Sequence, residues 1–274
     1  MRIHVVNFVL AGYLIVPVCL AQLRAPDERA VWELWKNHVE DPSRHATLAA
    51  ASRKAAESAA SDPLSNFARG LEAWHLLKQE KHAEARRLLE TILKSRPDSL
   101  PAFSEASAAM ARTWLTRLDR EQVKTALKRY YADHIEYPPS LAALEKAAPG
   151  INWPRTDRWN RPWDYRLVAL LTLPDMKGQK YQLASTRLGG DSELDKALER
   201  EYASGVRLEP AAIVSGTAGR ETVRFKPAGD DADSRSPILL SPGGESDGIM
   251  FAYMGSHILI LTDGNHWNVM PRPR

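Results

Sequence analysis

The stretch DRWNRPWDY, from Asp157 to Tyr165, decides how the second half of the chain folds. Two tryptophans, a proline and a tyrosine stand there among four charged residues. This composition is too aromatic for an ordinary surface loop and too charged for a core strand. Because aromatic rings bury a large area per residue, we predict a structural clasp in which Trp159 and Trp163 lie over a neighbouring helix. Pro162 is expected to set the entry to a strand.

The charged residues of this stretch leave room for a second interpretation. Arg158 and Arg161 are expected to stay at the rim of the clasp, but an aromatic ledge that binds a sugar or a peptide has a similar composition. The alternation of apolar and polar residues around Tyr165 and Leu167 leads directly into a strand. A structural clasp is therefore the prediction, with the binding ledge as the alternative.

An amphipathic helix is predicted before the clasp. Asp119 can cap its first turn, and Gln122 can reach back toward the cap. The residues of one helical stripe are Val123, Leu127, Tyr130 and His134.

Proline and turn residues set the limits of the elements that follow. Pro138 and Pro139 end the helix, and Ser140 starts a short new one. Two strands are predicted beyond the clasp, over residues 163–171 and 180–188, with a turn between them.

This order of parts resembles the globular domain of a major pseudopilin of type II secretion, over residues 122 to 191. That family reads aspartate-proline-tryptophan-glycine-asparagine-proline-tyrosine, one further residue, and tyrosine. Arg158, Asn160 and Arg161 depart from this pattern. The landmarks that match, with a tryptophan in place of one tyrosine, are Tyr137, Asp157, Trp159, Pro162, Trp163 and Tyr165.

The resemblance implies a long helix packed on an antiparallel sheet and a role in protein–protein contacts. It also raises calcium binding, which the family often shows near its C-terminal loops. One candidate set is Asp191, Glu193 and Asp195, and the other is Asp230, Asp231 and Asp233. Neither set has the spacing of a dedicated calcium loop, so a helix start and a solvated turn are the simpler interpretations. We therefore predict no metal or other cofactor.

The N-terminus departs from a true pseudopilin. Residues 1–21 have one arginine, a long apolar run and a small residue at Ala21, which is typical of a cleaved signal peptide. The run is long enough for an uncleaved membrane anchor as the alternative. A pilin leader is not recognisable, so we expect the chain not to polymerise. The single cysteine, Cys19, lies in this segment. An exported protein is expected, periplasmic or anchored in the inner membrane and facing the periplasm.

Residues 26–118 resemble tetratricopeptide (TPR) helical repeats. The best copy is NFARGLEAWHLLKQEKHAEARRLLETILKSRPDS, residues 66–99, whose length is the 34-residue TPR period. Its two helices are separated by a short break at residues 79–81. Because TPR arrays commonly present a groove to a partner peptide, the candidate partner-binding residues are Trp74, His75 and Arg86. The alternative is a helical bundle in which this spacing has no meaning.

From residue 206 onward the sequence favours short strands. Segments 221–228, 236–242, 248–255, 256–264 and 265–271 read as strands between turn residues. Gly255 and Gly264 are predicted to supply positive φ in two tight hairpins. These strands either complete the pseudopilin-like sheet or form an appended one.

Catalysis is not expected from the sequence. His257, Asp263 and His266 stand close together and suggest a hydrolase as a third hypothesis, but hairpin tips favour these residue types. No phosphate-binding loop, nucleophile elbow or zinc-protease motif is present. A net charge of +3 with scattered arginines predicts no nucleic-acid binding.

The sequence as a whole predicts an α+β protein with three folded parts. They are a TPR-like helical domain over residues 26–118, a pseudopilin-like α/β domain over 119–205 and a β-rich extension over 206–274. The leading hypothesis is a non-enzymatic accessory or scaffold protein of a type II secretion or type IV pilus-like envelope assembly. The alternative is a periplasmic TPR adaptor for peptide or protein ligands. The membrane is expected to be contacted only through an uncleaved N-terminal segment.

Overall fold

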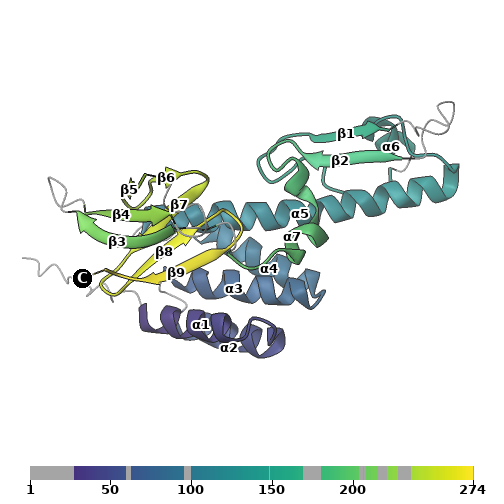
Figure 1. Ribbon diagram of the computed structural model, residues 1–274. Coiled ribbons are helices and arrows are strands. Elements are labelled where there is room, and N and C mark those ends of the chain that lie inside the picture. Colours follow the sequence, from purple (N-terminus) through teal and green to yellow (C-terminus); the bar gives the residue numbers. More distant parts are fainter. Residues whose placement is uncertain are drawn as a thin grey trace, which may run out of the picture.

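The computed structural model describes residues 28–59, 63–95, 100–147, 149–168, 180–203, 206, 208–214, 221–227 and 236–273. The expected signal segment, residues 1–21, and the calcium candidates Asp230, Asp231 and Asp233 lie outside these residues. Within the described ranges, no helix is long and apolar enough to cross a membrane. The protein has a mixed α+β fold with antiparallel sheets, as predicted (Figure 1).

The first part of the chain consists of helices that pack one against the next (Figure 1). The break predicted at residues 79–81 is confirmed. Asp41 and Pro42 follow directly on the first helix, and residues 79–81 separate the third helix from the fourth. The five helices are α1 (Glu28–Glu40), α2 (His45–Ser58), α3 (Ser65–Lys78), α4 (His82–Lys94) and α5 (Pro101–His134).

The helix starts recur at a different period from the one seen in the sequence. α3 begins at residue 65 and α5 at residue 101, so these two starts are 36 residues apart rather than 34. The packing face of α4 consists of Ala85, Leu89 and Ile92, which are all buried. The small side chain of Ala85, which is 0 % exposed, lets neighbouring helices approach closely.

Helix α5 is continuous over 34 residues, and this corrects the helix start predicted at Asp119. Asp119 lies in the middle of α5 and is 2 % exposed, so it cannot cap a helix there. The boundary expected between residues 118 and 119 falls inside this helix. α5 ends where Ile135 adopts a left-handed conformation with φ of 61°, shortly before Pro138.

A small unit surrounds the C-terminal part of α5, and Figure 1 shows it at the far end of that helix from the other sheets. Strands β1 (Trp163–Leu167) and β2 (Tyr181–Ser185) pair antiparallel as predicted, and the short helix α6 (Leu141–Ala147) follows Ser140. We call residues 123–168 and 180–185 the arm, within the described ranges. Its core consists of Val123, Ala126, Leu127, Leu144, Trp153, Trp163 and Leu183.

The C-terminal strands form two further sheets and do not join β1 and β2. All five predicted segments contain strands. The appended sheet, one of the two arrangements left open by the sequence, is therefore the observed one. Between the arm and these sheets lie η1 (Gly190–Ser192) and α7 (Leu194–Glu199). One sheet contains β3 (Leu208–Val214), β4 (Thr222–Pro227) and β5 (Ile238–Leu240), and the other β6 (Glu245–Ser246), β7 (Ile249–Met254), β8 (Ile258–Thr262) and β9 (Trp267–Pro271).

The sheet of β6 to β9 packs on the helices and shares one core with them. Trp267 is 0 % exposed and stacks on Phe103 of α5, with ring centroids 5.1 Å apart. Gly70 of α3 is required here because a Cβ atom would lie 2.5 Å from Met110 and 2.9 Å from Trp267. We call this assembly of α1–α4, the first half of α5 and β6–β9 the block.

The two hairpin glycines have different roles. Gly264 adopts positive φ, 80°, as predicted for the turn between β8 and β9. Gly255 does not belong to the positive-φ glycines, so the prediction for it is wrong. It is needed instead for space, because a Cβ atom there would lie 2.5 Å from the carboxylate of Glu28. That carboxylate accepts hydrogen bonds from the backbone N–H groups of Ser256 and His257, each at 2.8 Å, and so ties α1 to the β7–β8 turn.

Candidate functional site

The clasp is organised around the buried carboxylate of Asp157, which is 2 % exposed. One carboxylate oxygen accepts the N–H groups of Trp159 at 2.9 Å and Arg161 at 3.0 Å. The other accepts the hydroxyl of Ser185 on β2 at 2.8 Å. Asn160 lies between them with φ of 59°, a conformation that asparagine tolerates better than most residues. Asp157 therefore sets the loop conformation and joins it to the hairpin.

The aromatic residues of the clasp have unequal roles. Trp163 is buried in the arm core and donates its indole N–H to the carbonyl of Pro154 at 2.9 Å. Tyr165 donates its hydroxyl to the carbonyl of Pro138 at 2.7 Å, while Pro162 pairs with Thr156 just before β1.

Trp159 and Tyr137 lie outside the buried centre of the arm core. Trp159 is half-buried and covered by the guanidinium of Arg187, 5.1 Å from its ring centroid. Of the two tryptophans predicted to lie over the helix, Trp163 is therefore the one that belongs to the core. Tyr137 is partly buried and packs against Tyr181, with ring centroids 4.5 Å apart.

Arg158 is not a rim residue, which corrects the sequence prediction. Its guanidinium donates to the buried carboxylate of Asp119 at 2.5 Å and 3.1 Å. Arg86 of α4 donates to the same carboxylate at 2.5 Å. A buried carboxylate costs much free energy unless it is paired and hydrogen-bonded, and two arginines fulfil that need here. The network connects the clasp to α4 and α5 at the base of the arm.

The three candidate partner-binding residues do not form one surface. Arg86 is held by Asp119 between α4 and α5. Trp74 and His75 of α3 are 5 % and 0 % exposed, so their side chains face the interior of the block. A peptide groove that uses all three is not present.

Trp74 and His75 belong instead to a cluster that the sequence did not predict, in which His38 and His75 are buried and His45 is half-buried. His75 Nε2 lies 3.2 Å from His38 Nδ1, and His75 Nδ1 lies 3.0 Å from His45 Nδ1. We call His38, His45 and His75 the histidine cluster. Trp74 and Tyr202 pack around it, with the Tyr202 ring 4.3 Å from the His38 ring and 4.8 Å from the Trp74 ring.

The histidine cluster is built for neutral imidazoles. Burial lowers the pKa of His38 to about 4 and that of His75 to about 3, and the neighbouring histidines add to both shifts by repulsion. Burial also lowers the pKa of His45, with a further contribution from Lys78. A neutral imidazole has one N–H donor and one acceptor nitrogen, so His75 can donate to one neighbour and accept from the other. The hydrogen bonds of the cluster are thus satisfied in its uncharged form.

An open cleft of about 450 Å³ lies beside the cluster. Trp74 Nε1 and His266 Nε2 are buried without a hydrogen-bond partner among the described residues. The cleft is lined from α1, the α1–α2 connection, α2, α3 and the segment after α7, by residues that include Trp35, His38, His45, Trp74, Lys78 and Tyr202.

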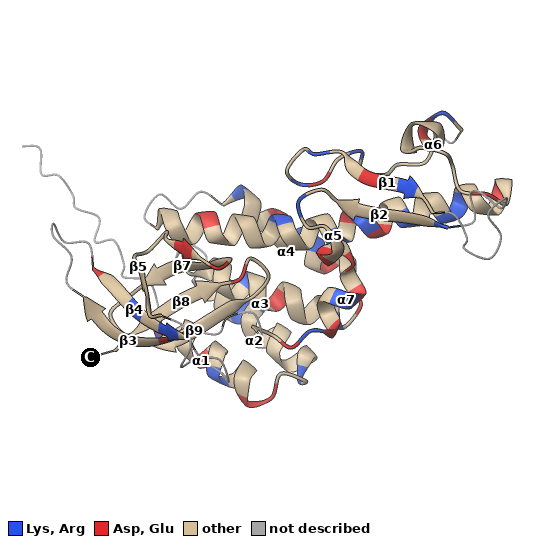
Figure 2. Ribbon diagram, turned by 45° about the horizontal axis from the view of Figure 1, so that its top comes forward, with Lys and Arg blue, Asp and Glu red and all other residues tan. Residues whose placement is uncertain are grey.

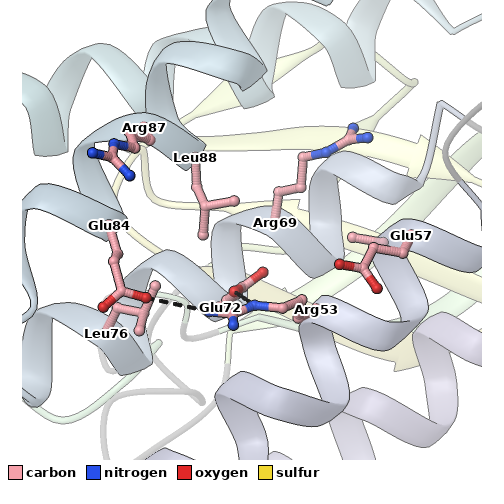
Figure 3. Close-up of a pocket in the computed structure, with 9 residues that line it drawn as sticks. Arg53, Glu57, Arg69, Glu72, Leu76, Glu84, Arg87 and Leu88 are labelled. Atoms are coloured by element: carbon pink, nitrogen blue, oxygen red, sulfur yellow. Dashed lines mark hydrogen bonds and ion pairs between the residues drawn. The ribbon is translucent and has the colours of Figure 1, made fainter.

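A second hollow, of about 380 Å³, lies on α2, α3 and α4 and has charged walls (Figure 3). Figure 3 shows Arg53 joined to both Glu72 and Glu84. Glu72 is 1 % exposed and lies 2.7 Å from Arg53. Burial raises the pKa of Glu72, against the opposing effect of Arg53. Because Arg53 pairs with Glu72 and Glu84, and Arg69 and Arg87 also line the hollow, its walls are of mixed charge.

The calcium candidates in the described residues are not arranged as a metal site. Asp191 is held by Arg200 at 2.5 Å, and Glu193 pairs with Lys196 at 3.2 Å. Asp195 is exposed in the first turn of α7. No group of three histidine, cysteine, aspartate or glutamate side chains in the described part of the chain could hold a metal ion.

The residues of the hydrolase hypothesis are separated. His257 precedes β8 and is 85 % exposed in its side chain, whereas Asp263 and His266 follow that strand. His266 is 4 % exposed and lies 3.5 Å from Asp263. Burial works to raise the pKa of Asp263, but hydrogen bonds from His266 and from backbone N–H groups lower it overall. Because a strand separates the two histidines, they cannot act on one substrate atom.

Comparison with known proteins gave no relatives for this chain: no family model, curated protein or solved structure matches it. The histidine cluster is the feature that sequence reasoning missed. His38 and His75 are 37 residues apart, close to the 36 residues that separate the starts of α3 and α5. Both histidines lie in the last turns of their helices, α1 and α3.

Proposed function

We propose that the protein is a non-enzymatic accessory or scaffold protein of an envelope assembly related to type II secretion or type IV pili, and that its arm contacts the assembly. The observation that carries this proposal is the arm itself. It combines the second half of a long helix, a tyrosine-proline helix end, the clasp and an antiparallel hairpin, in the order in which a major pseudopilin has these parts.

The clasp supports the resemblance in its details. Asn160 stands at the position where the family pattern has glycine, and its φ of 59° suits both residue types. Asp157, Pro162, Trp163 and Tyr165 all contribute to the fold of the loop or to its junction with β1. The proposal thus rests on a pattern whose residues have structural reasons for their spacing.

The distribution of exposed apolar residues favours contact through the arm. Among the described residues, three large apolar side chains are exposed: Ile135, Val39 and Leu239. Ile135, where α5 ends, is the most exposed of them, at 72 %. Figure 2 shows residues of both charge signs interspersed on the helices and the arm. An exposed apolar residue among mixed charges suits a polar-rimmed protein interface.

The TPR adaptor hypothesis has weaker support, because the α3 face that carries Trp74 and His75 is buried in the block. We keep the TPR-like resemblance of the helices in the proposal, with a structural role: the helices form a spacer that carries the arm. We place the protein on the exported side of the envelope, free or held by its N-terminal segment.

The test is affinity purification of C-terminally tagged protein from gently solubilised envelopes, read by mass spectrometry. The wild type is expected to retain pilin-like subunits, a secretin or an assembly-platform protein. Ile135→Asp is expected to lose them, because it places a charge on the exposed end of the arm. The matched control is Val39→Asp, which introduces the same charge at an apolar residue of the block that is 58 % exposed.

Two outcomes would contradict the proposal. One is recovery of soluble proteins alone by the wild type. The other is equal recovery of envelope components by Ile135→Asp and wild type, with a loss in Val39→Asp. The same sample gives the mature N-terminus, which separates a cleaved signal from an anchor.

A further inference from the structure

The histidine cluster joins parts of the chain that are far apart in the sequence. His38 comes from α1, His45 from α2 and His75 from α3. Tyr202, which packs against His38 and Trp74, comes from the segment after α7. Its hydroxyl oxygen accepts a hydrogen bond from the backbone N–H of Trp267 at 3.3 Å, and this bond links the cluster to β9. The cluster therefore lies where α1, α2 and the C-terminal sheet meet α3.

The hydrogen bonds of the cluster permit only a narrow set of protonation states. In the neutral chain, one outer histidine donates to His75, and His75 donates to the other outer histidine. A proton added to His45 can be accommodated, because His45 can still act as donor to His75. A second proton, on His75 or His38, places two donors face to face and two cations side by side in a buried site. The arrangement thus tolerates at most one charge.

We propose that His38, His45 and His75 form an acid-operated latch, which holds α1, α2 and the C-terminal sheet on α3 when neutral and releases them when protonated. The latch is independent of the proposed envelope function. It acts on the block and leaves the arm, which has its own core, in place.

The charged groups that face the latch give it little compensation for added protons. From the α1–α2 connection, Asp41 favours a charge on His45, while its own carboxylate is engaged by Ser43. From α3, Lys78 opposes a charge on His45. From the β8–β9 turn, His266 opposes a charge on His38, and Asp263 is engaged by His266.

The end of α7 and the segment after it also contribute charged residues to the adjoining cleft: Glu199, Arg200 and Glu201. Arg200 is paired with Asp191, and Glu201 is exposed. No carboxylate lies within salt-bridge distance of the cluster among the described residues. A buried positive charge on the latch would therefore remain without a direct counter-ion.

The sign of the pH effect follows from the lowered pKa values of His38 and His75. Above their unfolded pKa of about 6.5, both states are neutral and the latch is fully stabilising. Below it, the unfolded or opened state takes up protons that the closed state excludes. Stability is therefore lost progressively as the pH falls from about 6.5 to about 4. Each such histidine raises the opening constant about tenfold per pH unit in this window.

The experiment is native-state hydrogen exchange of the full chain at several pH values between about 7 and about 4.5, corrected for the intrinsic pH dependence of exchange. We expect the amides of α1 and of β9 to lose protection by about a hundredfold per pH unit, because two histidines are depressed in pKa. The amides of β1 and β2 in the arm are the internal reference and are expected to change much less.

A variant set separates the latch from general acid denaturation. His38→Gln combined with His75→Gln replaces both imidazoles by amides, which keep a donor and an acceptor but do not titrate in this range. In this double variant, we expect the protection of the α1 amides to fall by about a hundredfold less per pH unit than it does in the wild type. His82→Gln, at an exposed position of α4, is the matched control and is expected to behave as wild type.

The folded wild type gives a reading that does not depend on the variants. The histidine ring signals of a nuclear magnetic resonance titration are expected to show two rings still neutral at about pH 5. The proposal is overturned if these rings all titrate near their ordinary pKa while α1 stays protected. It is also overturned if the double variant and the wild type lose protection with the same slope.

Discussion

The two ends of helix α5 are surrounded in different ways. Its first half is enclosed by the other helices and by the sheet of β6 to β9, and all of these contribute to one large core. Among the described residues, its second half is covered by α6, β1 and β2, with a core of seven buried residues. The same helix thus serves as a central support in the block and as the supporting edge of the arm (Figure 1).

The difference shows how one chain separates stability from contact. The block satisfies its own apolar faces, since the α3 face with Trp74 and His75 is buried. The arm is small, and its end carries an exposed isoleucine. Small cores with few layers open at lower free energy than the large cores to which they are attached. We therefore expect the block to set the global stability and the arm to be a local unit.

The largest effect is expected from Trp267→Ala in the block. Trp267 is 0 % exposed and packs on Phe103, so its removal leaves a large cavity. The free energy of unfolding should fall by about 4 kcal/mol, and the whole block should unfold earlier. Urea denaturation followed by far-ultraviolet circular dichroism measures this change. A loss confined to the arm would contradict the assignment of Trp267 to the shared core.

A smaller and local effect is expected from Trp163→Ala in the arm. This change removes the indole from a core of seven residues and also breaks its hydrogen bond to Pro154. The local stability of the arm should fall by about 3 kcal/mol while the block keeps its midpoint. Limited proteolysis should then cut between residues 149 and 168 in the variant alone. Early unfolding of the block in this variant would remove the distinction between the two regions.

Gly70→Ala tests how closely the sheet approaches α3. The added methyl would lie 2.5 Å from the end of Met110 and 2.9 Å from Trp267, so one of them must shift. We expect a loss of about 2 kcal/mol in the free energy of unfolding. Gly150→Ala is the control, because nothing lies within 4 Å of its added methyl. Equal stability of the two variants would mean that the block is loosely packed there.

The smallest effect, and the only gain, is expected from Ile135→Gly in the arm. Ile135 has φ of 61°, which a β-branched residue adopts at a cost. Glycine should stabilise the end of α5 by about 1 kcal/mol, measured as increased amide protection in residues 128–134. Ile135→Ala removes the same apolar surface but keeps the Cβ atom, so it should give no comparable gain. A gain in both variants would point to the exposed surface rather than to the backbone.

Local chemistry made much of the fold predictable. Asp41 and Pro42 stop α1, Pro138 follows the end of α5, and Ser140 accepts the N–H of Ala143 at the start of α6. The C-terminal strands were predicted because turn residues separate short apolar runs. These features depend on residues that are neighbours in the sequence.

Features that depend on distant contacts were missed. Asp119 has the residue type of a helix cap, but Arg86 and Arg158 make it a buried anion in mid-helix. Gly255 has the residue type of a positive-φ turn, but it makes room for Glu28 from the other end of the described chain. The packing of β7, β8 and β9 on the helices likewise depends on long-range contacts, which no local sequence pattern predicts.

The histidine cluster shows the same limit for the candidate site. Trp74 and His75 are candidates for a partner groove because they stand on the first helix of the best TPR-like copy, and TPR arrays commonly present such a groove. The structure buries them, since His38 and Tyr202 reach them from α1 and from beyond α7. The 34-residue period seen in the sequence would not have paired His38 with His75, because these residues are 37 positions apart.

The most direct test of the account is photo-cross-linking in intact cells from three exposed apolar positions. A photoreactive residue would replace Ile135 in the arm, Val39 in the block or Leu239 in the C-terminal sheet, which are 72 %, 58 % and 56 % exposed. The account predicts adducts with a pilin-like subunit or other secretion component from position 135 and none with such proteins from the other two. Adducts with these components from position 39 or 239, and none from position 135, would contradict it.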